Sequence, residues 1–80
     1  MKANEILRTA MSEKGVTQKQ LASAIGAKSQ SVIAERLKTN SFTVSNLNSM
    51  LNVLGYELIV QQRKPGRRPE GQYVIDVAEE

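Results

Sequence analysis

The chain of 80 residues contains no cysteine, no histidine and no tryptophan, and its only aromatic residues are Phe42, Tyr56 and Tyr73. The missing Cys and His exclude disulfides, thiolate chemistry, most zinc sites and the residue that most often acts as a general base. Because aromatic side chains are so few, the core has to consist of Leu, Ile, Val, Met and Ala. This composition suits packed helices better than a β-sandwich.

Patterns typical of enzymes are also missing. No pair of acidic residues stands in a recognisable pocket pattern, and Gly66 and Gly71 lack the strand-to-helix context of a phosphate-binding loop. We therefore expect no enzymatic activity, no cofactor and no metal site.

Long apolar runs are absent as well, and no signal-peptide pattern opens the sequence. A cytoplasmic protein without a membrane partner is the expectation. The length corresponds to one domain whose core is small, so an oligomeric partner would add stability.

Charge is distributed unevenly along the chain. Residues 1–68 hold all eleven Lys and Arg against four Glu, a net charge of +7, whereas residues 69–80 hold four acidic residues and no basic one. The basic part favours a polyanionic partner, and the acidic end (expected to be flexible) favours solubility.

Helical periodicity begins at residues 4–14, where apolar side chains recur on one face and Gly15 stands at the position of a left-handed cap. Asn4 is the expected N-cap. The next helix, from residue 17 to Gly26, begins with a capping box formed by Thr17 and Gln20.

A third helix is predicted at residues 29–38, with Ser29 as its cap, and a fourth between Thr43 and Gly55. The order of helix, glycine turn and helix between Thr17 and Lys38 is that of a helix-turn-helix. The fold class is therefore mainly α.

After Gly55 the period changes. Residues 56–61 and 73–77 are rich in β-forming residues and predict two strands, separated by a loop with two Pro and two Gly. We expect residues 1–55 to form the helical domain, and 56–80 a β extension that takes part in dimerisation.

One face of the third helix is polar and nearly free of bulky groups. At about 100° per residue, Val32, Ile33 and Leu37 lie on one side and Arg36 lies at its edge. The opposite side carries Gln30, Ser31, Ala34, Glu35 and Lys38. Such a face fits a major groove about 12 Å wide, where Gln and Ser bond base edges.

The sequence resembles the XRE family of Cro/cI-type regulators. The resemblance lies in Thr17-Gln18-Lys19-Gln20-Leu21-Ala22, Ile25-Gly26 and Ser29-Gln30-Ser31-Val32-Ile33. It covers about residues 4–55 and implies a bundle of four or five helices that binds an operator as a homodimer and represses transcription.

The resemblance assigns Gln18 to a phosphate contact, and Gln30 and Ser31 to base reading. Ala22 and Gly26 match the small residue and the turn glycine of the motif. The turn has one residue more than is usual, and Arg36 stands where an apolar residue is common. These two departures leave the register of the base-reading residues open to a shift of one position.

The complete predicted interface with double-stranded DNA combines this face with its flanks. It contains Gln18, Lys28, Ser29, Gln30, Ser31, Ala34, Glu35, Lys38 and Asn40.

The segment Lys64-Pro65-Gly66-Arg67-Arg68-Pro69 has the composition of a minor-groove element. Arg67 and Arg68 are therefore hypothetical minor-groove or phosphate contacts. A solubilising turn explains the same residues.

Two functions follow from these patterns. The first is a dimeric repressor or autoregulator of phage, plasmid or mobile-element type. The second is an antitoxin that binds a toxin through the two strands at 56–61 and 73–77 and regulates its own operon.

Overall fold

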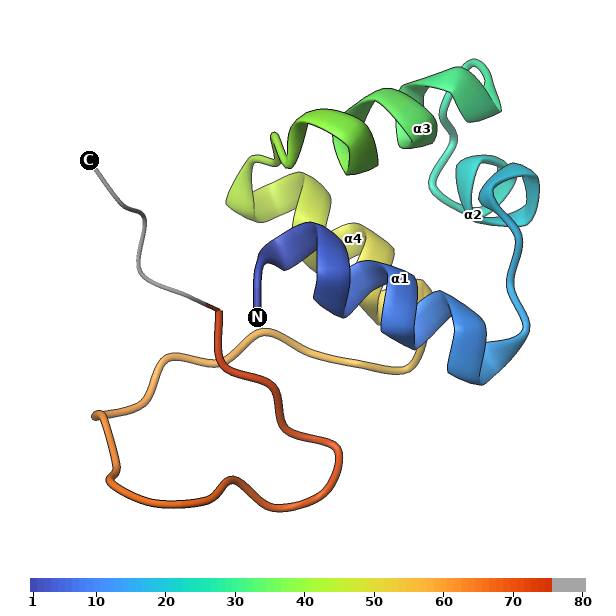
Figure 1. The fold of residues 1–80 in the computed structure, drawn as a ribbon. Coiled ribbons are helices and arrows are strands. Elements are labelled where there is room, and N and C mark those ends of the chain that lie inside the picture. Colours follow the sequence, from blue (N-terminus) through green and yellow to red (C-terminus); the bar gives the residue numbers. More distant parts are fainter. Residues whose placement is uncertain (76–80) are drawn as a thin grey trace.

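The computed structural model describes residues 1–75, and these residues contain four α-helices (Figure 1). The mainly helical class predicted from the sequence is confirmed. No helix of the described part is long and apolar enough to cross a membrane. The helices are α1 Ala3–Lys14, α2 Gln18–Ala24, α3 Gln30–Thr39 and α4 Val44–Val53.

Local hydrogen bonds define where two of the helices begin. The backbone N–H of Gln20 donates to Oγ1 of Thr17 at 3.1 Å, and the N–H of Thr17 donates to Oε1 of Gln20 at 2.9 Å. This pair is the predicted capping box. At the start of α4, Oγ1 of Thr43 accepts from the N–H of Asn46 at 3.0 Å. At the end of α1, Gly15 adopts a left-handed conformation with φ 65° and forms the predicted cap.

One predicted cap was wrong, and another is correct in position but makes no capping hydrogen bond. Helix α1 begins at Ala3 with Lys2 as its N-cap, so Asn4 lies within the first turn. Its N–H donates to Oδ1 of Asn40 instead, at 2.9 Å. Ser29 is the N-cap residue of α3, as predicted, but its side chain accepts no backbone N–H of the helix. Its hydroxyl pairs with that of Ser31 at 2.6 Å.

The core consists only of aliphatic side chains and methionines. α3 packs against α2 and α1, and α4 packs against α1 and α2, so all four helices face one apolar cluster. No polar residue of the described part is buried as a whole, although Oδ1 of Asn4 is buried without a hydrogen-bond partner. The buried residues are Ile6, Leu7, Ala10, Met11, Leu21, Ala22, Ile33, Leu37, Leu47, Met50, Leu51 and Leu54.

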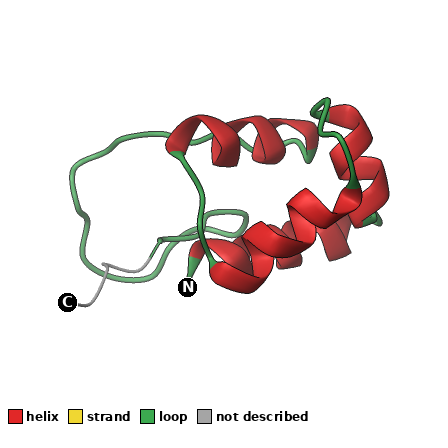
Figure 2. Cartoon of the chain, turned by 90° about the horizontal axis from the view of Figure 1, so that it is seen from above, coloured by secondary structure: helices red, strands yellow, loops and turns green. Residues whose placement is uncertain are grey.

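Residues 56–75, which we call the strap, form a long loop without β-strands (Figure 2). The strands predicted at 56–61 and 73–75 are therefore absent from the described residues, and Asp76 and Val77 lie outside them. Residues 57–68, apart from Pro65, carry backbone N–H groups, and none of these groups has a backbone partner in the described part. Tyr56, Leu58 and Tyr73 pack against the helical core instead, and this packing outweighs the β-propensity of the segment.

Glu13, near the end of α1, holds both tyrosines of the strap. The hydroxyl of Tyr56 donates to Oε2 of Glu13 at 2.8 Å, and that of Tyr73 donates to Oε1 at 3.0 Å. The two rings lie 6.2 Å apart, and Nζ of Lys14 lies 5.9 Å from the centre of the Tyr56 ring. At the other end of α1, the amino group of Met1 donates to the carbonyl of Val74 at 3.0 Å. The strap is thus attached at both ends of α1.

These hydrogen bonds change the acidity of the groups that make them. The Tyr56 and Tyr73 hydroxyls, with a smaller contribution from Lys14, lower the pKa of Glu13. The same carboxylate raises the pKa of Tyr56 to about 12 and also raises the pKa of Tyr73. Both directions favour the state in which Glu13 is ionised and both tyrosines are protonated.

Candidate nucleic-acid interface

Helix α3 is held in place by one buried side. Ile33 and Leu37 are fully buried against the core, and Val32 and Arg36 are half-buried beside them. This agrees with the predicted division of the helix into two sides. Burial of two branched aliphatic side chains contributes about 3–6 kcal/mol relative to exposure, so the orientation of α3 about its axis is well determined.

The opposite side of α3 is exposed over the length of the helix. Each predicted base-reading residue lies on this side, and Lys28 and Ser29 extend it into the preceding turn. The exposed residues are Lys28, Ser29, Gln30, Ser31, Ala34, Glu35 and Lys38. The structure therefore brings seven of the nine predicted contacts together on one surface, formed by the turn and α3.

Gln18 lies apart from these seven, on α2. It is the first residue of that helix, and its side chain is half-buried. Helix α2 packs directly against α3, so Gln18 belongs to the neighbouring helix and not to the surface formed by the turn and α3.

Asn40 has a structural role in addition to its exposed position. It ends α3 in a left-handed conformation with φ 52°, and its Oδ1 accepts the N–H of Asn4. Asn4 completes the junction, because its Nδ2 donates to the carbonyl of Leu37 at 2.9 Å. The end of α3 is therefore tied to the start of α1.

An open hollow runs beside α3 and adds residues that the sequence did not indicate. Arg36, predicted only to lie at the edge of the apolar side, lines this hollow with Val32 and Thr39. Nothing local in the sequence marks the hollow, because Ser41 joins it from the link that follows α3. The lining residues are Ser31, Val32, Glu35, Arg36, Thr39 and Ser41.

The charges on this side are mainly positive. Lys28, Arg36 and Lys38 carry positive charge, and Glu35 carries the only negative charge on α3. None of them forms a salt bridge within residues 1–75, so all three cations are available to an anionic partner. A carboxylate repels phosphate groups, and carboxylates in other proteins accept a hydrogen bond from the N4 amine of cytosine.

Arg67 and Arg68 lie away from this surface. In Figure 1 the strap, drawn in orange and red, lies beside α1 and α4, at the opposite end of the view from the start of α3. Arg67 is exposed, and Arg68 is half-buried. The structure thus separates the two arginines from the seven residues of the turn and α3.

The exposed side of α3 thus combines polar side chains and the small Ala34 with flanking cations, and the opposite side of the helix is buried in the apolar core. Comparisons with protein-family models, curated proteins and solved structures find no match for this chain.

Proposed function

We propose that this protein is a sequence-specific DNA-binding regulator of transcription, acting as a homodimer that represses its target or its own gene. α3 is the recognition helix and lies in the major groove. Gln30 and Ser31 contact base edges, and Lys28 and Lys38 contact phosphates. This function agrees with the resemblance of residues 4–55 to the XRE family.

The observation that carries the proposal is the two-sided character of α3. A helix that only covers the core needs no particular side chains on its solvent side. Here that side combines the polar side chains of Gln30 and Ser31 and the small methyl group of Ala34 with a lysine at each end. Short side chains let the helix axis approach the base edges, and the cations neutralise the phosphates on either side of the groove.

A dimer of this kind requires a fixed distance between the two half-sites of its operator. Two recognition helices related by a two-fold axis read half-sites whose centres are about 34–36 Å apart, one turn of B-DNA. Specific affinity falls steeply with salt, because each neutralised phosphate releases counterions.

Selection of bound sequences from random double-stranded DNA tests the proposal. We expect enrichment of a two-fold symmetric site with half-sites one helical turn apart. On that site Gln30→Ala reduces affinity by about tenfold, as expected for the loss of 1–3 kcal/mol of base discrimination. The matched control is Asn52→Ala, which shortens an exposed amide on α4 and leaves affinity unchanged.

Two outcomes contradict the proposal. One is a selection that enriches no sequence, with a binding isotherm insensitive to salt. The other is an equal loss of DNA affinity in Gln30→Ala and Asn52→Ala, because α3 would then contribute no more to DNA binding than α4 does.

The strap supplies the dimer contact in this proposal. Ile59 and Val60 are 62% and 104% exposed, and the backbone N–H groups around them have no backbone partner in the described residues. Pairing of this segment with the same segment of a second chain satisfies those groups and produces the strand that the single chain does not form.

The antitoxin function is the second candidate, and the same exposed side chains favour it. A toxin that covered Ile59 and Val60 would bury apolar surface as well as a second copy does. Co-purification of a small partner protein from the native host at a fixed stoichiometry, lost in Val60→Glu, supports this alternative. A dimer that forms with the purified chain alone supports the homodimer.

A further inference from the structure

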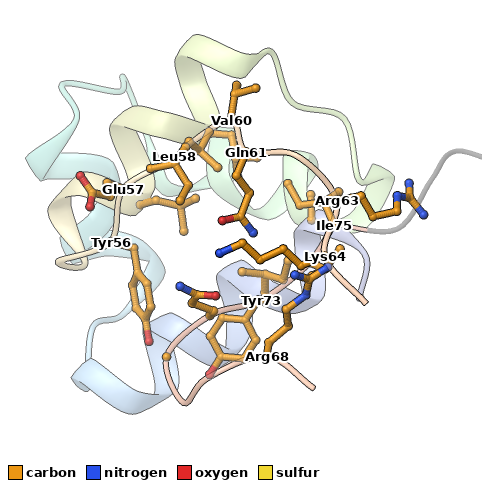
Figure 3. Close-up of a pocket in the computed structure, with 18 residues that line it drawn as sticks. Tyr56, Glu57, Leu58, Val60, Gln61, Arg63, Lys64, Arg68, Tyr73 and Ile75 are labelled. Carbon is orange, nitrogen blue, oxygen red and sulfur yellow. The ribbon is translucent and has the colours of Figure 1, made fainter. Parts of the chain in front are cut away.

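A cavity of about 590 Å³ lies between the strap and the helical body (Figure 3). Its volume falls within the range of small-molecule sites in proteins, roughly 300–1,000 Å³. It lies on the side of the body formed by α1 and α4, away from the exposed surface of α3. We propose that this cavity binds a small amphipathic carboxylate, with an apolar body and a single negative charge. The proposal does not depend on DNA binding.

The floor of the cavity is apolar. Ile6 of α1 and Leu47 and Leu51 of α4 form it, and Leu58, Val74 and Ile75 of the strap form its walls. An apolar ligand body in contact with these side chains is removed from water, at about 25 cal/mol for each Å² of apolar surface buried.

The polar lining is mostly cationic. Three cations line the cavity, namely Arg63, Lys64 and Arg68, and one carboxylate, that of Glu57, lines it as well. None of the four forms a salt bridge within residues 1–75. Figure 3 shows the side chains of Lys64 and Arg68 directed into the space between strap and body, with Gln61 above them, whereas Arg63 points outward. Lys64 and Arg68 therefore provide a place for one anion.

Arg68 differs from the other cations of the strap because it is half-buried, while Arg63, Lys64 and Arg67 are exposed. Guanidinium groups that leave water are normally paired with an anion, and Arg68 has no such partner among the described residues. A carboxylate between Arg68 and Lys64 supplies this partner, while an apolar tail lies on Ile6 and Leu51.

Titration calorimetry of the full chain with decanoate, below the concentration at which decanoate aggregates, tests the site. We expect saturable binding to the wild type with one ligand per chain. Decanol, which has the same tail and no charge, binds at least tenfold more weakly. A charge-assisted hydrogen bond of 1.5–3 kcal/mol corresponds to a factor of this size.

Neighbouring arginines provide the matched variants. Arg68→Gln removes a cation that lines the cavity, and Arg67→Gln removes an adjacent cation that does not. We expect Arg68→Gln to weaken decanoate binding about tenfold and Arg67→Gln to change it less than twofold. Circular dichroism of both variants verifies that the helices are intact.

Several results overturn the proposal. The absence of saturable decanoate binding would contradict the site. So would an affinity for decanol equal to that for decanoate, or an equal loss of decanoate affinity in Arg68→Gln and Arg67→Gln. Binding that appears only after Asp76, Glu79 and Glu80 are changed to their amides assigns the cavity to the acidic residues of the chain itself. Binding that weakens as the protein concentration is raised assigns it to a second copy.

Discussion

A single carboxylate, Glu13, accepts hydrogen bonds from two tyrosines that approach it from both ends of the strap. All three groups lie at the surface, so solvent screens the interaction. Their effect is seen more clearly in acidity than in stability. The direction of each pKa shift shows which protonation states favour the hydrogen bonds between Glu13 and the two tyrosines. Glu13 must be ionised, and Tyr56 and Tyr73 must be protonated.

Attachment of the strap should therefore depend on pH at both extremes. The contribution of Glu13, whose pKa is lowered, is present above the ordinary value of 4.5 and disappears as the pH falls through the lowered value. The contribution of Tyr56 is present below pH 10.0 and disappears as the pH rises towards 12. Tyrosinate absorbance measures the second transition directly.

The matched variants for this measurement are two Glu→Gln substitutions. Glu13→Gln should return the pKa of Tyr56 from about 12 towards 10.0. Glu57→Gln, next to Tyr56 in sequence but without a hydrogen bond to it, should leave that pKa unchanged. A tyrosine titration in Glu13→Gln that is the same as in the wild type would refute the hydrogen bonds between Glu13 and the tyrosines.

Glu35 is the residue of the α3 surface whose charge opposes a nucleic-acid partner. Glu35→Gln removes one repulsion from phosphates and keeps the length of the side chain. We expect tighter binding to random-sequence DNA, by a few-fold at low salt, and a smaller preference for the selected site. Competition binding with both DNAs measures the two effects, and Glu5→Gln, on α1, is the control. Binding to random DNA that is unchanged in Glu35→Gln would place Glu35 away from the DNA.

At the scale of elements, the short helix α2 depends on its capping box. It contains only seven residues, and isolated helices of this length are not stable in water. The two reciprocal hydrogen bonds of Thr17 and Gln20 satisfy backbone donors at its start, and Leu21 and Ala22 attach it to the core. The position of α3 depends on α2, because the two helices pack against each other.

Thr17→Ala should lower the free energy of unfolding by about 1 kcal/mol, the usual cost of losing a Thr cap. The control is Thr39→Ala, since the hydroxyl of Thr39 donates to the carbonyl of Glu35 within α3 and caps no helix start. We expect the control to change stability by less than about 0.5 kcal/mol. Urea denaturation followed by circular dichroism measures both. Equal destabilisation by the two substitutions would contradict the role of the capping box.

At the scale of the whole molecule, the strap leaves apolar side chains and unpaired backbone groups on the surface. A chain of 80 residues has a small core, and the strap contributes to it through Tyr56, Leu58 and Tyr73. Ile59 and Val60 face solvent in the single chain, and a second chain that covers them would bury both the side chains and the edge of the segment.

Val60→Glu should convert the dimer into a monomer, because it places a charge in the proposed contact without disturbing any packed group of the single chain. Val44→Glu is the control: Val44 is also exposed, at 78%, but lies at the start of α4. Light scattering over a range of concentrations measures the mass of both variants. A dimer that persists in Val60→Glu, or that is lost only in Val44→Glu, would move the interface away from the strap.

The sequence by itself determined the four helices, their glycine and threonine caps, and the division of α3 into a buried and an exposed side. These features depend on hydrogen bonds and periodicities between residues three or four apart, as in the Thr17 and Gln20 pair. The residues of the exposed side could be named from the sequence for the same reason.

Only the tertiary structure decided the path of the strap and the junction of α1 with α3. Asn4 and Asn40 are 36 residues apart, Glu13 and Tyr56 are 43 apart, and Glu13 and Tyr73 are 60 apart. No local pattern encodes such pairs. The β-forming residues of the strap predicted strands, but pairing requires a partner strand. In the single chain its tyrosines pack on the helices instead, and this packing also creates the cavity beside Arg68.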